Sequence, residues 1–147
     1  MPALAAFPLQ ALTATFAVNV VAPIALTQLL LPQLRQRGGE VVNISSDAAV
    51  EPYEGWGGYG ASKAALDHAS AILSLEEPTV RVWAVDPGDL RTQMHQDAFP
   101  GEDISDLPLP ETVVPAFLRL IDERRPSGRY QASDLLPRAV AADAEVG

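Results

Sequence analysis

The sequence of 147 residues has no cysteine and only one lysine, Lys63. A chain without cysteine can form no disulfide and no thiolate metal site, which fits the cytoplasm. The other basic residues are all arginine, and 10 basic side chains face 19 acidic ones, for a net charge of −9. Since no basic run offsets this charge, neither a nucleic acid nor an anionic membrane surface is expected as a partner.

Long apolar runs and clustered metal ligands are missing as well. Residues 1–8 are apolar but contain two prolines and no basic residue, which argues against a signal peptide. Prolines and polar residues interrupt the most apolar stretch, residues 20–34, and we judge it too short and too polar for a membrane span. The acidic residues of segment 102–106 are scattered in a proline-rich loop, so no metal site is expected.

Helical and strand-like segments alternate along the chain. We predict helices over residues 9–37, 59–75 and 110–123, and short strands over residues 40–45, 79–85 and 129–132. We expect residues 89–109 to form a long irregular loop and residues 138–147 to form a frayed tail. Such alternation predicts an α/β fold with a parallel sheet and right-handed crossovers, in a single domain over residues 1–147. Ligands bind such sheets at the carboxyl ends of the strands.

Tyr59 and Lys63 stand four residues apart at the start of a predicted helix. At this spacing the two side chains leave the same helix face. An ammonium beside a phenol favours the phenolate, so we expect Lys63 to lower the pKa of Tyr59 from its usual value of about 10. The pair therefore indicates acid–base chemistry on an alcohol or a carbonyl group.

Pro23 lies inside the first predicted helix and has no N–H group to donate. The main-chain carbonyl four residues earlier, that of Asn19, loses its helical partner for this reason. The position indicates either a harmless kink or a water site beside Asn19.

Four motifs resemble the short-chain dehydrogenase/reductase family. Asn19, Ser46, Tyr59 and Lys63 follow one another at separations of 27, 13 and 4 residues. The motifs that carry the resemblance are Asn19-Val20-Val21-Ala22-Pro23, Asn43-Ile44-Ser45-Ser46, Tyr59-Gly60-Ala61-Ser62-Lys63 and Asp86-Pro87-Gly88-Asp89-Leu90-Arg91-Thr92. The resemblance implies a three-layer, Rossmann-like, doubly wound parallel sheet.

The resemblance also implies a role for each matching residue. Tyr59 would be the general acid and base, and Ser46 would position the substrate oxygen. Lys63 would lower the pKa of the tyrosine and bind the nicotinamide ribose. The main-chain carbonyl of Asn19 would hold a water in the proton relay. The wall beside the nicotinamide would consist of Pro87, Gly88, Leu90 and Thr92, and residues 89–109 would form the substrate loop.

One part of the family pattern is missing. The glycine-rich turn that seats the dinucleotide pyrophosphate after a first strand has no counterpart in this sequence. The resemblance therefore covers only the C-terminal, catalytic half of the family domain. The strand over residues 40–45 should then have an open edge.

Two functions follow as expectations. The first is an oxidoreductase that transfers hydride between NAD or NADP and a small carbonyl compound or secondary alcohol. The alternative is an inactive fragment, or an interaction protein, that lacks the dinucleotide-binding half. An epimerase-like relative shares the Tyr59–Lys63 spacing but fits the segment after Pro87 less well.

The resemblance also implies a homo-oligomer formed through the helices that contain Asn19 and Tyr59. Among the other candidate site residues, we expect Trp56 to be a packing residue. His95 is a candidate for substrate contact, but we favour a solvated loop histidine.

Overall fold

The protein was analysed as a computed structural model that describes residues 2–136. The predicted tail, residues 138–147, lies outside the described residues. Three parallel strands form one sheet in the order β1 (Glu40–Ile44), β2 (Arg81–Asp86) and β3 (Gly128–Gln131). Val42 is in register with Trp83, and Val85 with Tyr130. The parallel sheet and its crossovers agree with the predicted α/β fold.

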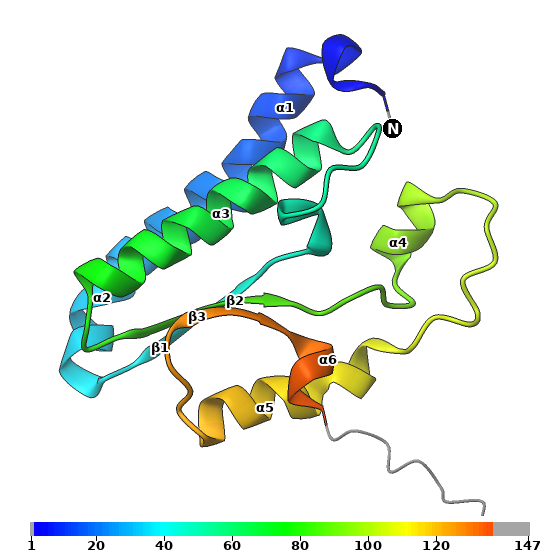
Figure 1. Cartoon of the computed structure of the whole chain (residues 1–147). Helices are drawn as coiled ribbons and strands as arrows, with labels where there is room; N and C mark the ends of the chain where they lie inside the picture. The colour runs from blue at the N-terminus through cyan, green and yellow to red at the C-terminus, as the bar shows by residue number, and fades with distance from the viewer. Residues whose placement is uncertain (1, 137–147) are drawn as a thin grey trace, which may run out of the picture.

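Helices cover both faces of the sheet (Figure 1). The helix predicted over residues 9–37 is continuous, and it consists of α1 (Leu9–Phe16), a π-helical turn (Ala17–Val21) and α2 (Ala22–Arg37). It lies beside α3 (Gly57–Glu76) on one face, and α5 (Val114–Asp122) covers the other face (Figure 1). The structure is therefore the three-layer, Rossmann-like arrangement, with fewer strands than a complete domain of this kind.

Two helices were not predicted. Inside the segment 89–109, expected to be irregular, lies α4 (Gln93–Ala98), and α6 (Ala132–Leu135) follows the last strand directly. Neither is long enough to show a hydrophobic period, which is the main signal for a helix in a sequence. A cap begins α4 instead, because the hydroxyl of Thr92 accepts a hydrogen bond from the N–H of His95 at 3.1 Å.

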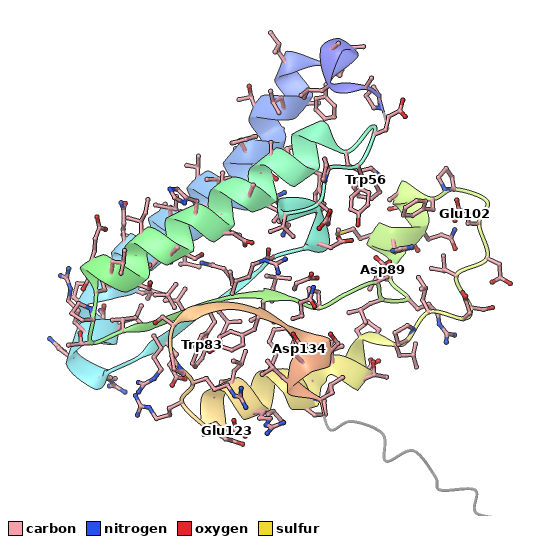
Figure 2. The ribbon with its side chains drawn as sticks, viewed as in Figure 1. Trp56, Trp83, Asp89, Glu102, Glu123 and Asp134 are labelled. Carbon is pink, nitrogen blue, oxygen red and sulfur yellow. The ribbon has the colours of Figure 1, made fainter. Side chains whose placement is uncertain are left out.

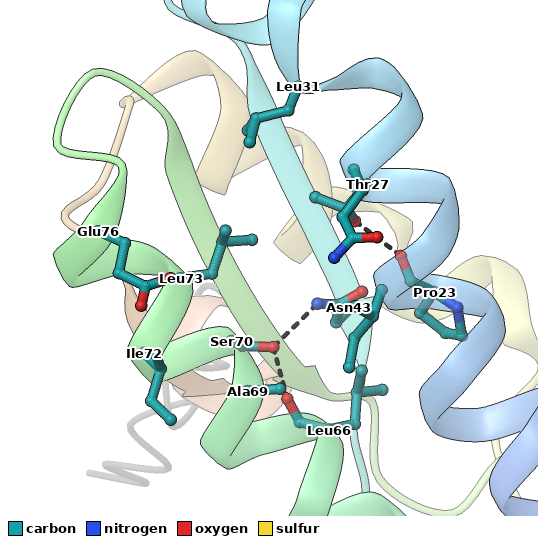
Figure 3. Close-up of a pocket in the computed structure, with 12 residues that line it drawn as sticks. Pro23, Thr27, Leu31, Asn43, Leu66, Ala69, Ser70, Ile72, Leu73 and Glu76 are labelled. Carbon is teal, nitrogen blue, oxygen red and sulfur yellow. Dashed lines mark hydrogen bonds between the residues drawn. The ribbon is translucent and has the colours of Figure 1, made fainter.

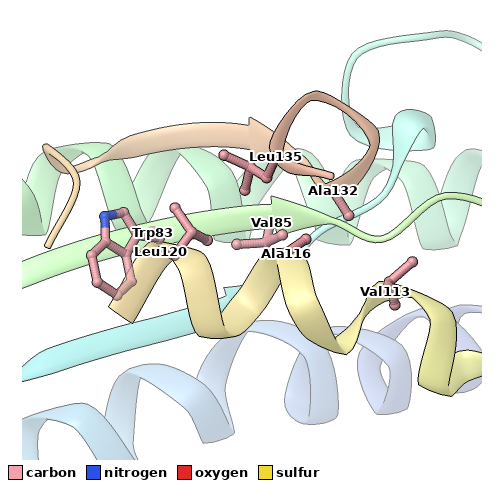
Figure 4. Packing of buried hydrophobic residues seen from close by; sticks show 7 residues of the cluster. All are labelled: Trp83, Val85, Val113, Ala116, Leu120, Ala132 and Leu135. Atoms are coloured by element: carbon pink, nitrogen blue, oxygen red, sulfur yellow. The ribbon is translucent and has the colours of Figure 1, made fainter. Parts of the chain in front are cut away.

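The main core lies between the sheet and the α5–α6 side (Figure 4). Trp83 is fully buried, and its indole N–H donates to the carbonyls of Arg125 and Pro126. Packed with it are Val85, Val113, Ala116, Leu120, Ala132 and Leu135. This core holds β2 and β3 rigidly, and so it fixes the position of the loop that follows β2.

The opposite edge of the sheet is open. Within residues 2–136, β1 pairs only with β2, as predicted for the strand over residues 40–45. No residue of α2, which lies along this edge, is buried. Three leucines of α2 are exposed by about half or more: Leu26 59%, Leu29 75% and Leu30 47%. Exposed apolar surface of this kind, next to an unpaired strand, is typical of a docking face.

The apolar stretch of residues 20–34 was judged too short and too polar for a membrane span, and the helix Leu9–Arg37 corrects this expectation. With 29 residues and a mean hydropathy of 1.8 over its most apolar window, it has the length and composition of a membrane span. Its polar contacts are nevertheless specific, since the side chain of Asn19 donates to the hydroxyl of Ser62 in α3 at 2.9 Å. This helix is therefore tied to α3 through polar side chains on its inner face.

A small cavity of 230 Å³ separates α2 from α3 above β1 (Figure 3). Its walls are mostly apolar, with Leu31, Leu66 and Leu73 among them. Inside it, Asn43 donates to Ser70, and Ser70 donates to the carbonyl of Leu66. Gln28 and Glu76 also line the cavity, which lies beside the open edge of the sheet.

Candidate active site

A larger cavity of 590 Å³ lies at the carboxyl ends of β1 and β2. Its volume is in the range of small-molecule sites. Seven of the eight sequence-predicted site residues line it: Ser46, Tyr59, Lys63, Pro87, Gly88, Leu90 and Thr92. The eighth, Asn19, does not line it. The fold thus assembles residues from β1, α3 and the loop after β2 around one cavity, as the topology predicts.

Close packing of α3 on the loop after β1 brings Ser46 and Tyr59 together. A Cβ atom at Gly60 would lie 2.7 Å from the main-chain oxygen of Ala48, so a side chain at this position would push the loop away. Ser46 caps the short 3-10 turn Asp47–Ala49 by accepting from the N–H of Ala48 at 3.2 Å. Its hydroxyl donates to the carboxylate of Asp47 at 2.9 Å. Ser46 is thus both a capping residue and part of the cavity wall.

The pKa of Tyr59 differs from the sequence expectation. Burial raises the pKa of this tyrosine, hydrogen bonding by Ser46 lowers it, and the charges of Asp47 and Asp86 raise it further, so that the net shift is upward. The expected lowering by Lys63 is wrong for this structure. The ammonium lies over the face of the tyrosine ring, 5.5 Å from its centroid. In the absence of a bound ligand, Tyr59 is a protonated acid at neutral pH.

Lys63 connects the catalytic helix with the end of β1. Its ammonium group donates to the main-chain carbonyl of Ile44 at 2.8 Å, and its other two protons have no hydrogen-bond partner in the described part of the chain. Burial lowers the pKa of Lys63, while the negative charge of Asp67, one turn later in α3, raises it by a smaller amount. The side chain is therefore fixed at the floor of the cavity with donors still available.

We predict that Lys63 titrates below the usual lysine value of about 10.4. Since it is the only lysine, selective ¹³C labelling gives one side-chain signal, and its pH titration by NMR measures the pKa directly. Asp67→Asn removes the negative charge that favours the ammonium, so the titration midpoint should fall further. The urea-unfolded chain is the control and should titrate normally; a folded chain with the same midpoint would contradict the burial of Lys63.

Asn19 occupies the middle of the π-helical turn Ala17–Val21. The N–H of Ala22 bonds to the carbonyl of Ala17, five residues back, in the turn just before Pro23. Irregular turns of this type often occur at functional positions. The side chain of Asn19 bonds to Ser62, whose hydroxyl in turn donates to the carbonyl of Tyr59 at 2.7 Å. Asn19 thus contacts the catalytic helix through its side chain, a bond that the sequence did not reveal.

Arg129 of β3 joins three parts of the site. Its guanidinium donates to Asp67 of α3 at 3.0 Å, to the main-chain carbonyl of Ser46 at 2.9 Å and to Asp86 at the end of β2 at 3.4 Å. The side chains of Asp67 and Asp86 are only 14% and 5% exposed. The Oδ1 atom of Asp67 is buried without a hydrogen-bond partner. Arg129 therefore neutralises two buried carboxylates while holding the Ser46 loop.

We expect Arg129→Met to lower the free energy of unfolding by about 3 kcal/mol, because it leaves the carboxylates of Asp67 and Asp86 buried without their cation. Urea unfolding followed by circular dichroism measures this loss. Arg125→Met is the matched control: Arg125 pairs with Glu123 on the surface, and its loss should cost less than about 1 kcal/mol. Equal costs for the two variants would contradict a structural role for the Arg129 network.

Aromatic residues form a part of the site that the sequence expectations missed. Trp56 and His95 both line the cavity, so they are not simply a packing residue and a solvated loop residue. The His95 side chain is 19% exposed and its ring stacks on Phe99 with the centroids 4.8 Å apart. In Figure 2, Trp56 and Asp89 lie beside α4, far from Trp83 in the core. No local pattern in the sequence indicates this contact, because it depends on the unpredicted helix α4.

Comparison with known proteins agrees with this geometry. Residues 2–103 match the sequence profile of the short chain dehydrogenase family. An uncharacterised oxidoreductase of Escherichia coli is 39% identical over 115 residues, which are 76% of this chain and 46% of the relative. A benzil reductase of Saccharomyces cerevisiae is 43% identical over 86 residues, which are 56% of this chain and 33% of the relative. The chain thus spans less than half the length of these relatives.

Solved structures of short-chain dehydrogenases are also similar to this chain. A short-chain dehydrogenase of Shigella flexneri, in complex with NADP, superposes with a TM-score of 0.84 at 32% identity. The match covers 89% of this chain and 57% of that one. The Escherichia coli oxidoreductase, in its solved structure, also has a TM-score of 0.84, at 33% identity. With the profile match over more than half of its residues, the chain belongs to the short-chain dehydrogenase family.

Proposed function

We propose that this chain carries the catalytic machinery of an NAD(P)-dependent oxidoreductase that interconverts a carbonyl compound and a secondary alcohol. The observation that supports it is the meeting of Ser46, Tyr59 and Lys63 in one cavity of 590 Å³ at the carboxyl ends of two parallel strands. All three side chains come from separate positions in the sequence, and the cavity is large enough for a small substrate.

In the direction of reduction, the nicotinamide supplies a hydride to the carbonyl carbon when it is bound. The electron pair of the C=O π bond moves to the oxygen, which takes its proton from the hydroxyl of Tyr59. Ser46 orients the same oxygen by exchanging the hydrogen bond that its hydroxyl donates to Asp47 for one to the substrate. Lys63 stabilises the negative charge left on Tyr59, and the water proposed at the carbonyl of Asn19 returns the proton through Lys63. The alcohol product carries one hydride and one proton more than the ketone.

The described residues fit one end of the cofactor. Lys63 has two free donors for the nicotinamide ribose, and Pro87, Gly88, Leu90 and Thr92 provide a wall for the ring. Gly88 has a positive φ of 76° and nothing within 4 Å of the position of a Cβ atom, so its main chain is open to close approach. In residues 2–136, no glycine-rich strand–turn–helix stands where a pyrophosphate would bind. We infer that the chain alone binds the cofactor through its nicotinamide end only, and weakly.

The test is reduction of a ketone by millimolar NADPH, with the alcohol identified by chromatography. The wild-type chain should form the alcohol, and the chain without a ketone should consume no NADPH. If NADPH is consumed but no alcohol appears, the oxidoreductase function is wrong for this chain.

An interaction protein is the second candidate, supported by the exposed leucines of α2 and by the free edge of β1. In this case the residues Ser46, Tyr59 and Lys63 would have only a structural role. Cofactor binding separates the two candidates, since an interaction protein has no reason to keep a nicotinamide site.

We also propose that the chain associates with itself through α1–α2 and α3. Both carry exposed apolar side chains on their outer surface, such as Leu29 (75% exposed) and Leu75 (83% exposed). Sedimentation velocity at micromolar concentration should show a dimer or a larger species, and Leu26→Glu with Leu29→Glu should shift it to monomer because two charges enter the interface. A wild-type chain that sediments only as a monomer would contradict this prediction.

A further inference from the structure

A wall of aromatic rings extends from Tyr59 across the cavity. Trp56 meets the Tyr59 ring edge to face, with centroids 5.7 Å apart, and lies 5.5 Å from the ring of Phe99. Phe99 ends α4, so the wall joins the beginning of the catalytic helix to the substrate loop. All of these rings line the cavity. A planar ring bound next to the Tyr59 hydroxyl would therefore find aromatic contacts on this side.

The polar part of the lining is strongly acidic. Four carboxylates line the cavity, and Lys63 is the one lysine or arginine among the lining residues. The acids are Asp47, Glu54, Asp86 and Asp89. Lys63 already donates to the carbonyl of Ile44, and Arg129 neutralises Asp86 from outside the cavity.

None of the other three acids pairs with a lysine or an arginine of the described residues. Asp47 accepts a hydrogen bond from the hydroxyl of Tyr53 at 2.8 Å, which stabilises its charged form without removing the charge. Glu54 and Asp89 are exposed residues of the cavity lining, and the carboxylate of Asp89 lies 3.8 Å from Nδ1 of His95. No arginine among the described lining residues offers the paired donors that a carboxylate or phosphate prefers.

We propose that this cavity selects uncharged or cationic aryl ketones, whose ring lies against Trp56 and Phe99 while the carbonyl oxygen meets Tyr59, and that it rejects ketones bearing a carboxylate or phosphate. The proposal rests on the proposed function for the orientation of the carbonyl group. The aromatic wall supplies the affinity for the ring, and the acidic lining excludes anions.

Binding to the purified chain tests the proposal without any cofactor. The probes are acetophenone, cyclohexyl methyl ketone, 4-acetylbenzoate and 4-acetyl-N,N,N-trimethylanilinium, and saturation-transfer NMR gives each Kd. We expect acetophenone to bind about fivefold tighter than the cyclohexyl ketone. The anion should bind at least tenfold more weakly than acetophenone, and the cation at least as tightly as acetophenone. Equal affinity for acetophenone and 4-acetylbenzoate would overturn the proposal.

Variants assign the effect to the wall and to the acids. Trp56→Leu should weaken the binding of acetophenone about fivefold and that of the cyclohexyl ketone less than twofold, because only the aromatic ring of acetophenone loses a stacking partner. The double variant Glu54→Gln, Asp89→Asn should reduce the ratio of the Kd of 4-acetylbenzoate to the Kd of acetophenone at least threefold. If Trp56→Leu does not fold, as judged by circular dichroism, Phe99→Leu tests the same prediction.

The two proposals fail in different ways. If aryl ketones bind as expected and are not reduced at millimolar NADPH, the substrate class stands and the oxidoreductase function fails. If ketones are reduced but anionic and neutral ones bind equally well, the function stands and the substrate class is wrong. An unchanged acetophenone affinity in a folded Trp56→Leu variant also overturns the aromatic wall.

Discussion

NADPH should bind this chain with a Kd near or above 1 mM, and reduced nicotinamide mononucleotide should bind within about threefold of the same value. A Kd of 1 mM corresponds to about 4 kcal/mol of binding free energy, half of the roughly 8 kcal/mol of a micromolar complex. The reason is that Lys63 and the Pro87–Gly88 wall can hold the nicotinamide and its ribose, while the described residues form no pyrophosphate seat.

Titration of cofactor fluorescence, with both ligands under the same conditions, measures the two constants. Lys63→Met is the control, and it should weaken the binding of both ligands equally, because both carry the nicotinamide ribose. Micromolar binding of NADPH with much weaker binding of the mononucleotide would show that the chain does hold the adenine and pyrophosphate end, and the account of the cofactor site would be wrong.

Tyr59→Phe should lower the rate of ketone reduction by at least about 100-fold. The variant removes only the hydroxyl proton donor, and a positioned general acid contributes about 100- to 10,000-fold. Because burial raises the pKa of Tyr59, the phenol stays protonated at neutral pH. The wild-type rate should therefore be flat through neutral pH and should fall only at alkaline pH, where Lys63, whose pKa is lowered, loses its proton first and Tyr59, whose pKa is raised, loses its proton later.

Tyr53→Phe is the matched control for this variant. Tyr53 also lines the cavity, but its hydroxyl donates to Asp47 at 2.8 Å and is thus already used. We expect Tyr53→Phe to change the rate less than about fivefold, because it removes no reacting proton. Alcohol formation under millimolar NADPH, measured for all three proteins, gives the comparison. A Tyr59→Phe variant as fast as Tyr53→Phe would refute the role of Tyr59.

The long-range order of the fold could be predicted from local patterns. The helix over residues 9–37 was found because Gly38 ends it, and the structure gives Gly38 a left-handed φ of 57°. The strands were found because short apolar runs follow glycine or proline breaks. Their carboxyl ends then placed Ser46 and the Pro87–Gly88 segment at the same side of the sheet.

The interior chemistry of the site could not be predicted in the same way. The sequence places Lys63 next to Tyr59, but not how far each is buried, and burial reversed the expected direction of the tyrosine pKa. Arg129 is 83 residues from Ser46 in sequence, yet it donates to the main-chain carbonyl of that serine. Contacts of this kind depend on strand register, which no local pattern specifies.

The aromatic wall was missed for a related reason. Trp56 and Phe99 come from separate segments and meet only because α4 folds over the cavity. The helix α4 (Gln93–Ala98) is too short for its sequence to show an apolar period, and a cap marks its beginning. The open face of α2 was predicted only in part, because the unpaired edge of β1 was expected whereas the absence of any fully buried residue in α2 was not.

Deuterium transfer is the measurement that tests the central claim most directly. The wild-type chain is incubated with about 5 mM NADPH that carries deuterium at the nicotinamide C4, several times the expected Kd, together with acetophenone. We predict 1-phenylethanol with one deuterium on its carbinol carbon, formed by the wild-type chain and by Tyr53→Phe, and essentially none with Tyr59→Phe. If mass spectrometry finds no deuterated alcohol above the protein-free reaction, or equal amounts with Tyr59→Phe, the chain does not perform hydride chemistry with Tyr59 as its acid.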